Sequence, residues 1–193
     1  METCKKNYSI LSRIKKSIKT KKNVVEFINK KVVLVGNPNV GKSVIFNDLT
    51  GSYVTVSNYP GTTVEINKGN FLFDNYKAEI IDTPGMYSMV SITDEERVTR
   101  NILMEDRPDL VVHVIDAKNI KRMLPLTIQL IEAGFNLVLV LNIMDEAKDL
   151  GMKIDTKKLE EILKIKIIET SAALNKGLKD VLKSIKEHLA YVA

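Results

Sequence analysis

Residues 36–43 read Gly-Asn-Pro-Asn-Val-Gly-Lys-Ser, and this stretch constrains the fold more than any other part of the chain. It fits the pattern G-x-x-x-x-G-K-[ST], with a β-branched run before it at 31–35 and a helix-like segment after it at 44–50. Glycines let backbone N–H groups approach phosphate oxygens, and a helix N-terminus adds partial positive charge. The sequence therefore predicts a phosphate-binding loop between a strand and a helix. The expected contacts are Gly36, Asn37, Pro38, Asn39, Val40, Gly41, Lys42, Ser43 and Val44.

Strand-like and helix-like segments alternate along residues 31–193. This pattern predicts an α/β domain with a mostly parallel six-stranded sheet and helices on both faces, and ligands bind at the carboxyl ends of such strands. The expected strands are 31–35, 64–73, 77–82, 109–115, 136–141 and 165–169, and the expected helices are 44–50, 93–105, 122–133, 155–163 and 177–190.

Asp-Thr-Pro-Gly, residues 82–85, ends one of these strands. An acidic residue there can hold Mg²⁺, usually through water, and the Gly85 N–H can meet a γ-phosphate. Lys42 is expected to reach the β- and γ-phosphates, and the Ser43 hydroxyl to bind the same Mg²⁺ as Asp82. The short motif is weak alone, but its position about 40 residues after the phosphate loop strengthens the interpretation.

Asn-Ile-Met-Asp, residues 142–145, follows an apolar strand. The Asn142 amide can bond the O6/N7 edge of guanine, and the Asp145 carboxylate can accept from N1–H and the exocyclic amino group. Adenine lacks this donor pair, so the motif discriminates between purines. Ser171 and Ala172, after the last strand, are expected to place a backbone N–H on guanine O6. The ordered motifs predict GTP and GDP as ligands.

Residues 52–63 are expected to form a long loop that carries a hydroxyl for Mg²⁺ and the γ-phosphate. Thr62 and Thr63 both qualify chemically, and the residues alone do not choose between them.

Residues 1–30 form a basic amphipathic extension before the main domain at 31–193. Ile10, Ile14 and Ile18 recur every four residues with lysines between them, which predicts a short N-terminal helix. Residues 1–31 hold ten Lys or Arg against two Glu, a net charge of +8. Three interpretations stay open: a solvated helix, a helix on an anionic membrane surface, and an RNA-binding arm.

Longer strings around these motifs are similar to the cytosolic G domain of the ferrous-iron transporter FeoB. They read GNPNVGKS, NYPGTTVE, DTPGMYS, DEERVTRNIL, PDLVVHVIDAKN and LNIMDEA, over about residues 31–190. The resemblance implies a P-loop GTPase fold, Mg²⁺ as cofactor, Thr63 as the switch threonine that binds Mg²⁺, and K⁺ held by Asn39 as an activator. It also implies a cytoplasmic location at the inner face of the cell membrane and, as partner, a membrane part that moves Fe²⁺.

Two residues set expectations about rate and affinity. Met86 follows Gly85 where Ras-like switches carry a water-orienting Gln, so slow intrinsic hydrolysis is expected, with Lys42, Asn39, Thr63 and Gly85 as the catalytic set. Ile143 stands where many GTPases carry a Lys that packs over guanine, which predicts modest nucleotide affinity and fast nucleotide exchange.

The favoured function is a GTPase switch that regulates ferrous-iron uptake. The alternative is a stand-alone ribosome- or RNA-associated GTPase that uses the basic arm.

Overall fold

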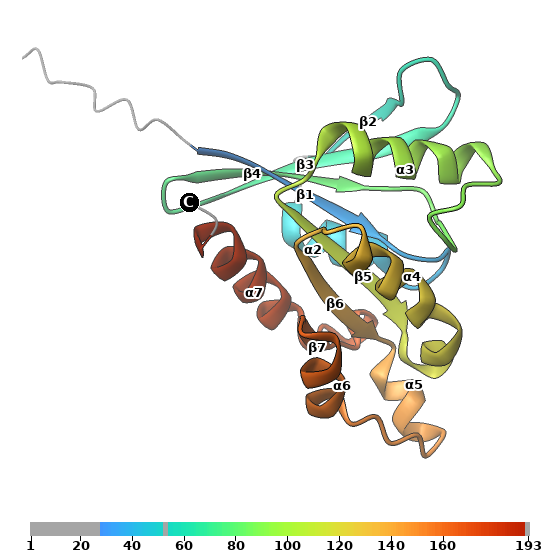
Figure 1. Ribbon diagram of the computed structural model, residues 1–193. Helices are drawn as coiled ribbons and strands as arrows, with labels where there is room; N and C mark the ends of the chain where they lie inside the picture. The colour runs from blue at the N-terminus through green and yellow to red at the C-terminus, as the bar shows by residue number, and fades with distance from the viewer. Residues whose placement is uncertain (1–27, 52–53, 192–193) are drawn as a thin grey trace, which may run out of the picture.

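The computed structural model describes residues 28–51 and 54–191 (Figure 1). The helix predicted within the N-terminal extension lies outside these residues. The strands are β1 (Ile28–Val35), β2 (Val54–Asn58), β3 (Glu65–Phe73), β4 (Tyr76–Asp82), β5 (Leu110–Asp116), β6 (Leu137–Asn142) and β7 (Lys166–Glu169). The helices are α2 (Lys42–Thr50), α3 (Asp94–Asp106), α4 (Ile120–Glu132), α5 (Met144–Asp149), α6 (Thr156–Leu163) and α7 (Leu178–Tyr191), with short 3₁₀ turns η1 (Ala117–Asn119) and η2 (Ala172–Leu174).

The strands form one sheet in the order β2-β3-β4-β1-β5-β6-β7. β1 and β4 to β7 run parallel, whereas β2 and β3 add antiparallel pairs at one edge. Over residues 28–51 and 54–191 the sheet therefore has seven strands, and the prediction of six was one short. The extra strand, β2, lies in the expected loop 52–63, and all five of its residues are exposed. Without a buried face it has no alternating apolar pattern to reveal it.

Apolar side chains cover the two faces of the sheet in two clusters. One joins Val32, Val112 and Val138 to helices α2 and α7, and the other joins alternate residues of the same strands to α3 and α4 (Figure 1). β5 and β6 are buried along their whole length, as expected for central strands covered on both faces. Within 28–51 and 54–191, no helix combines the length and apolar character needed to cross a bilayer.

The topology places the three motif loops at one end of the sheet. The phosphate loop follows β1, the Asp-Thr-Pro-Gly turn follows β4 and the Asn-Ile-Met-Asp loop follows β6, and these three strands are parallel. A turn at Asp74-Asn75 joins β3 and β4. Helix α5 was not predicted, because its six residues are too few to show a helical repeat.

Candidate guanine-nucleotide site

The phosphate loop takes a backbone shape that its glycines permit. Gly41 has φ +90°, and Gly36 has φ +154° and packs against the Val114 carbonyl of β5. A Cβ at Gly41 would overlap the amide group of Asn142, which comes from the base-recognition loop. Both glycines therefore allow other parts of the chain to approach the loop closely.

Lys42 lies at the start of α2 with its side chain turned into the phosphate loop. It is 7% exposed, and its Nζ donates to the carbonyl oxygens of Gly36 at 3.1 Å and Asn37 at 3.0 Å. Burial lowers the pKa of Lys42, and the charge of Asp82 opposes this shift. A phosphate group beside the ammonium would stabilise the charged form that burial disfavours.

Ser43 and Asp82 come together from α2 and β4 as the Mg²⁺ prediction requires. The Ser43 hydroxyl donates to Oδ2 of Asp82 at 2.8 Å. Oδ1 of Asp82 is buried and has no hydrogen-bond partner among the described residues. Burial raises the pKa of Asp82, opposed by the Ser43 hydrogen bond and the charge of Lys42. A divalent cation would favour the ionised form, and the hard oxygen donors present suit Mg²⁺.

Gly85 packs directly on the phosphate loop. A Cβ there would lie 2.5 Å from Cγ and 2.8 Å from the backbone N of Pro38. The next residue, Met86, is fully buried, and its N–H donates to the Gly36 carbonyl at 3.1 Å. The motif after β4 is thus joined to the phosphate loop, and Met86 is an anchor of this contact. The hydroxyl of Thr83 adds a buried bond to the Leu34 carbonyl at 2.7 Å, a tie that sequence reasoning missed.

Asn142 connects three loops through its side-chain amide. Its Nδ2 donates to the Val40 carbonyl at 2.9 Å. Its Oδ1 accepts from the Thr170 hydroxyl at 2.9 Å and from the Ala172 N–H at 3.0 Å. One Nδ2 hydrogen remains for a base edge, whereas the Ala172 N–H expected on guanine O6 is used internally in this structure. Asn142 therefore holds the phosphate loop against both base-recognition loops.

Asp145 and Ser171 also meet. The Asp145 backbone N–H donates to the Ser171 hydroxyl at 3.0 Å, and hydrogen bonding from Ser171 holds the pKa of the Asp145 carboxyl below its usual range. The carboxylate is ionised at neutral pH, the form that accepts two N–H donors from guanine. Ile143, at φ +62°, precedes α5 without a side-chain cap.

Residues 54–64, called switch I below, fold back as a hairpin on β3. Asn58 pairs with Glu65, and the Tyr59 N–H donates to the Val64 carbonyl at 2.9 Å. The Thr62 hydroxyl donates to the Tyr59 carbonyl at 3.0 Å and accepts from the Val64 N–H at 3.2 Å. Thr62 therefore shapes the turn.

Thr63 is exposed, and the hollow that it lines contains no residue of the phosphate loop. It lines a hollow of about 670 Å³ beside α3, together with Asp94, Arg97 and Asn101. The structure brings together Lys42, Ser43, Asp82 and the base loops but does not bring Thr63 to them. A Thr63 contact with Mg²⁺ requires switch I to rearrange.

Tyr59 holds switch I on α3. Its hydroxyl donates to Oε2 of Glu105 at 3.2 Å. The pKa of Tyr59 is raised by burial first and then by the charges of Glu105 and Asp106. Tyr59 thus keeps its proton and its donor role at neutral pH.

The segment 86–93, called switch II below, is held by Glu96, which sequence reasoning missed. Its carboxylate accepts from the N–H groups of Ile92 at 2.8 Å, Tyr87 at 3.1 Å and Thr93 at 3.3 Å. The Thr93 hydroxyl accepts from the Glu96 N–H in return, which completes a capping box. The pattern T-x-x-E at 93–96 was the available signal.

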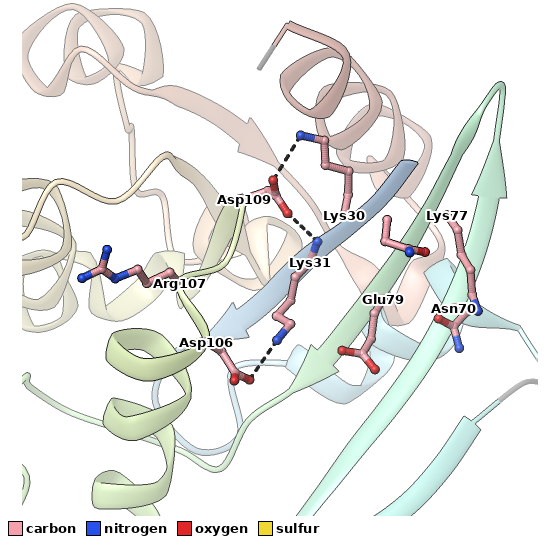
Figure 2. A pocket seen from close by; sticks show the side chains of 9 residues that line it. Lys30, Lys31, Asn70, Lys77, Glu79, Asp106, Arg107 and Asp109 are labelled. Carbon is pink, nitrogen blue, oxygen red and sulfur yellow. Dashed lines mark hydrogen bonds and ion pairs between the residues drawn. The ribbon is translucent and has the colours of Figure 1, made fainter. Parts of the chain in front are cut away.

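A second, polar hollow of about 400 Å³ lies at the amino ends of the strands, away from the motif loops (Figure 2). Lys30 pairs with Asp109 at 3.1 Å, Lys31 pairs with Asp106 at 3.2 Å, and the Lys31 N–H donates to Asp109 at 2.7 Å. These bonds tie the start of β1 to the α3–β5 connection. They explain this cluster of charges as part of the fold.

Comparison with known proteins identifies the domain. The family model described as ferrous iron transport protein B matches residues 30–185. The chain is 37% identical over 155 residues to the Fe(2+) transporter FeoB of Campylobacter jejuni and 42% identical over 156 residues to an Fe(2+) transport protein A/FeoB fusion protein of Porphyromonas gingivalis. Each match covers 80% of this chain but only 25% and 18% of those relatives. This chain therefore spans a quarter or less of their length.

Solved structures agree with this match. The FeoB G domain of Methanococcus jannaschii superposes with a TM-score of 0.73 at 41% identity, covering 84% of this chain and 98% of that one. The cytosolic domain of T. maritima FeoB in a GDP form superposes with a TM-score of 0.79 at 38% identity, covering 83% and 63%. The P-loop GTPase fold implies GTP binding, and the predicted resemblance is confirmed. The chain belongs to the FeoB family of ferrous iron transport proteins and corresponds to the G domain of that family.

Proposed function

We propose that this domain is a GTP-binding switch that hydrolyses GTP to GDP slowly. The observation that carries the proposal is the arrangement around α2: buried Lys42 inside the phosphate loop, beside the Ser43–Asp82 pair. Phosphoryl transfer needs mainly positioning and charge neutralisation. Ser43 and Asp82 would hold Mg²⁺, which when bound neutralises phosphate charge.

The residues around the γ-phosphate position support a low intrinsic rate. Lys42 and the loop N–H groups can neutralise phosphate oxygens, and Gly85 packs against Pro38 of the phosphate loop. Met86 is fully buried and apolar, so it cannot orient an attacking water. Thr63 joins only when switch I leaves its hairpin. Hydrolysis therefore depends on a rearrangement as well as on chemistry.

Asn39 supports the proposal of K⁺ activation. It lies exposed at the tip of the phosphate loop with φ +62°. Its amide oxygen is a neutral oxygen ligand that can bind a monovalent cation. A cation there would add positive charge beside the phosphates.

The link to iron rests on the relatives. Those from C. jejuni and P. gingivalis are called an Fe(2+) transporter and an Fe(2+) transport fusion protein. We propose that this G domain regulates ferrous-iron uptake from the cytoplasmic face of the cell membrane, with the membrane part of such a transporter as its partner.

GTP hydrolysis with either K⁺ or Na⁺ as the only monovalent cation tests the catalytic part. Wild type with Mg²⁺ should turn over faster in K⁺, and Asn39→Ala should remove that difference. Asn47→Ala, an exposed asparagine on α2, is the matched control and should behave as wild type. Equal rates in the two salts would reject K⁺ activation, and absence of GTP and GDP binding would reject the switch itself.

A further inference from the structure

The turn after β5 is shaped by the buried carboxylate of Asp116. Its Oδ1 accepts from the Lys118 N–H at 2.9 Å and its Oδ2 accepts from the Asn119 side chain at 2.8 Å. Asp116 also pairs in register with Asn142 on β6. The turn η1 therefore lies beside the base-recognition loop, and Asp116 fixes the backbone from which Lys118 extends.

Lys118 reaches from η1 to the first turn of α5. Its Nζ bonds to Oε2 of Glu146 and lies 4.0 Å from Oδ2 of Asp116. Hydrogen bonding to Glu146 raises the pKa of Lys118, and the charges of Asp116, Glu146 and Asp145 act in the same direction. The ammonium thus lies against the carboxylates of Glu146 and Asp116, and Glu146 is the residue next to the predicted guanine acceptor Asp145.

The start of α5 is held on one side by the loop after β7, where the Met144 N–H donates to the Thr170 carbonyl at 3.1 Å. Ile143 precedes the helix without a side-chain cap, and an isoleucine offers no polar group to a neighbouring loop. The bond from the Asp145 N–H to Ser171 holds one side of this turn. The Lys118–Glu146 pair holds the other side against the end of β5.

We propose that Lys118 is a positioning residue for guanine recognition, which acts through Glu146 to hold Asp145 in the orientation that accepts from the N1–H and the exocyclic amino group. This inference rests on the proposed guanine-nucleotide function. Lys118 supplies a positive charge beside the base-recognition loop. Ile143, which stands where many GTPases carry a lysine, supplies no such charge.

The test compares affinities for GDP and IDP, because IDP lacks the exocyclic amino group and loses one bond to Asp145. Wild type should prefer GDP. Lys118→Met should reduce the GDP-over-IDP preference roughly three- to fivefold, as suits one partly exposed ion pair. Lys118→Arg, which keeps the positive charge, should keep the wild-type preference. Glu146→Gln should give the same loss, and the double variant Lys118→Met/Glu146→Gln should be no worse than either single one.

Lys166→Met is the control, because it breaks the exposed Lys166–Glu160 pair near β7 and should leave the preference unchanged. Equal weakening of GDP and IDP in Lys118→Met, or an unchanged preference, overturns the inference while nucleotide binding by wild type still stands. If wild type binds neither nucleotide, the proposed function fails instead. Thermal melting of each variant shows that the fold is retained.

Discussion

The phosphate loop and switch I differ in how their functional side chains are held. Lys42, Ser43 and Asn142 already form hydrogen bonds that converge on one place. Thr63 instead projects from an exposed hairpin beside α3. The first region is preorganised for phosphate and base, so binding there costs little ordering. If Thr63 binds Mg²⁺ as proposed, switch I must rearrange, which would give the domain two states for a nucleotide to select.

The largest expected effect comes from the preorganised region. Lys42→Ala removes the buried ammonium that is proposed to neutralise transferring phosphate oxygens, and hydrolysis should fall by about 10²–10³. Single-turnover hydrolysis and fluorescent-GDP binding measure the loss. Lys157→Ala changes an exposed lysine on α6 and should have no effect. A Lys42→Ala variant with near-normal turnover would mean that the phosphate loop is not the reaction centre.

Switch I should show a different kind of loss. Thr63→Ala should lower Mg²⁺-dependent hydrolysis about tenfold, less than the typical cost of losing one transition-state donor, while GDP affinity stays unchanged. Thr62→Ala should leave hydrolysis closer to wild type, because its hydroxyl bonds only within the turn. The two variants are neighbours and serve as matched controls. A larger loss in Thr62→Ala would reassign the switch threonine.

The same contrast explains what could be predicted from sequence. The motifs after β1, β4 and β6 are short, ordered and tied to strand ends, so their convergence at one edge follows from a parallel sheet. Strand β2 could not be predicted, since none of its residues is buried. The internal bonds of Asn142 and the Lys118–Glu146 pair join residues 28 positions or more apart. Such pairings depend on tertiary packing, which local patterns do not encode.

Switch II should depend on pH through Glu96. The N–H groups of Ile92, Tyr87 and Thr93 lower the pKa of Glu96 below its ordinary value of 4.5, against the opposing effect of burial. The carboxylate therefore stabilises the fold fully above that ordinary value, and this contribution is lost as pH falls through the lowered folded value. Glu96→Gln should lose about 1–2 kcal/mol of unfolding free energy at pH 7.

Urea titrations of wild type and Glu96→Gln at pH 7 and in steps below pH 4.5 should show the two curves converging as the solution becomes more acidic. Glu95→Gln is the control, because Glu95 is exposed in the same helical turn. A constant gap across the whole pH range would assign the stability loss to packing instead of charge.

The smallest effect addresses the bond that holds switch I on α3. Tyr59→Phe removes the hydroxyl that donates to Glu105, and a single exposed bond of this kind contributes little stability. If the hairpin opposes closure on a triphosphate, its loosening should tighten Mg²⁺-dependent binding of a non-hydrolysable GTP analogue roughly two- to threefold. GDP affinity should not change, because Thr63 is proposed to act with Mg²⁺ and the γ-phosphate, which GDP lacks. Tyr76→Phe, on a ring that stacks on Phe73, is the control. Weaker analogue binding in Tyr59→Phe would show that this contact belongs to the closed state, and switch I would then be partly preorganised like the phosphate loop.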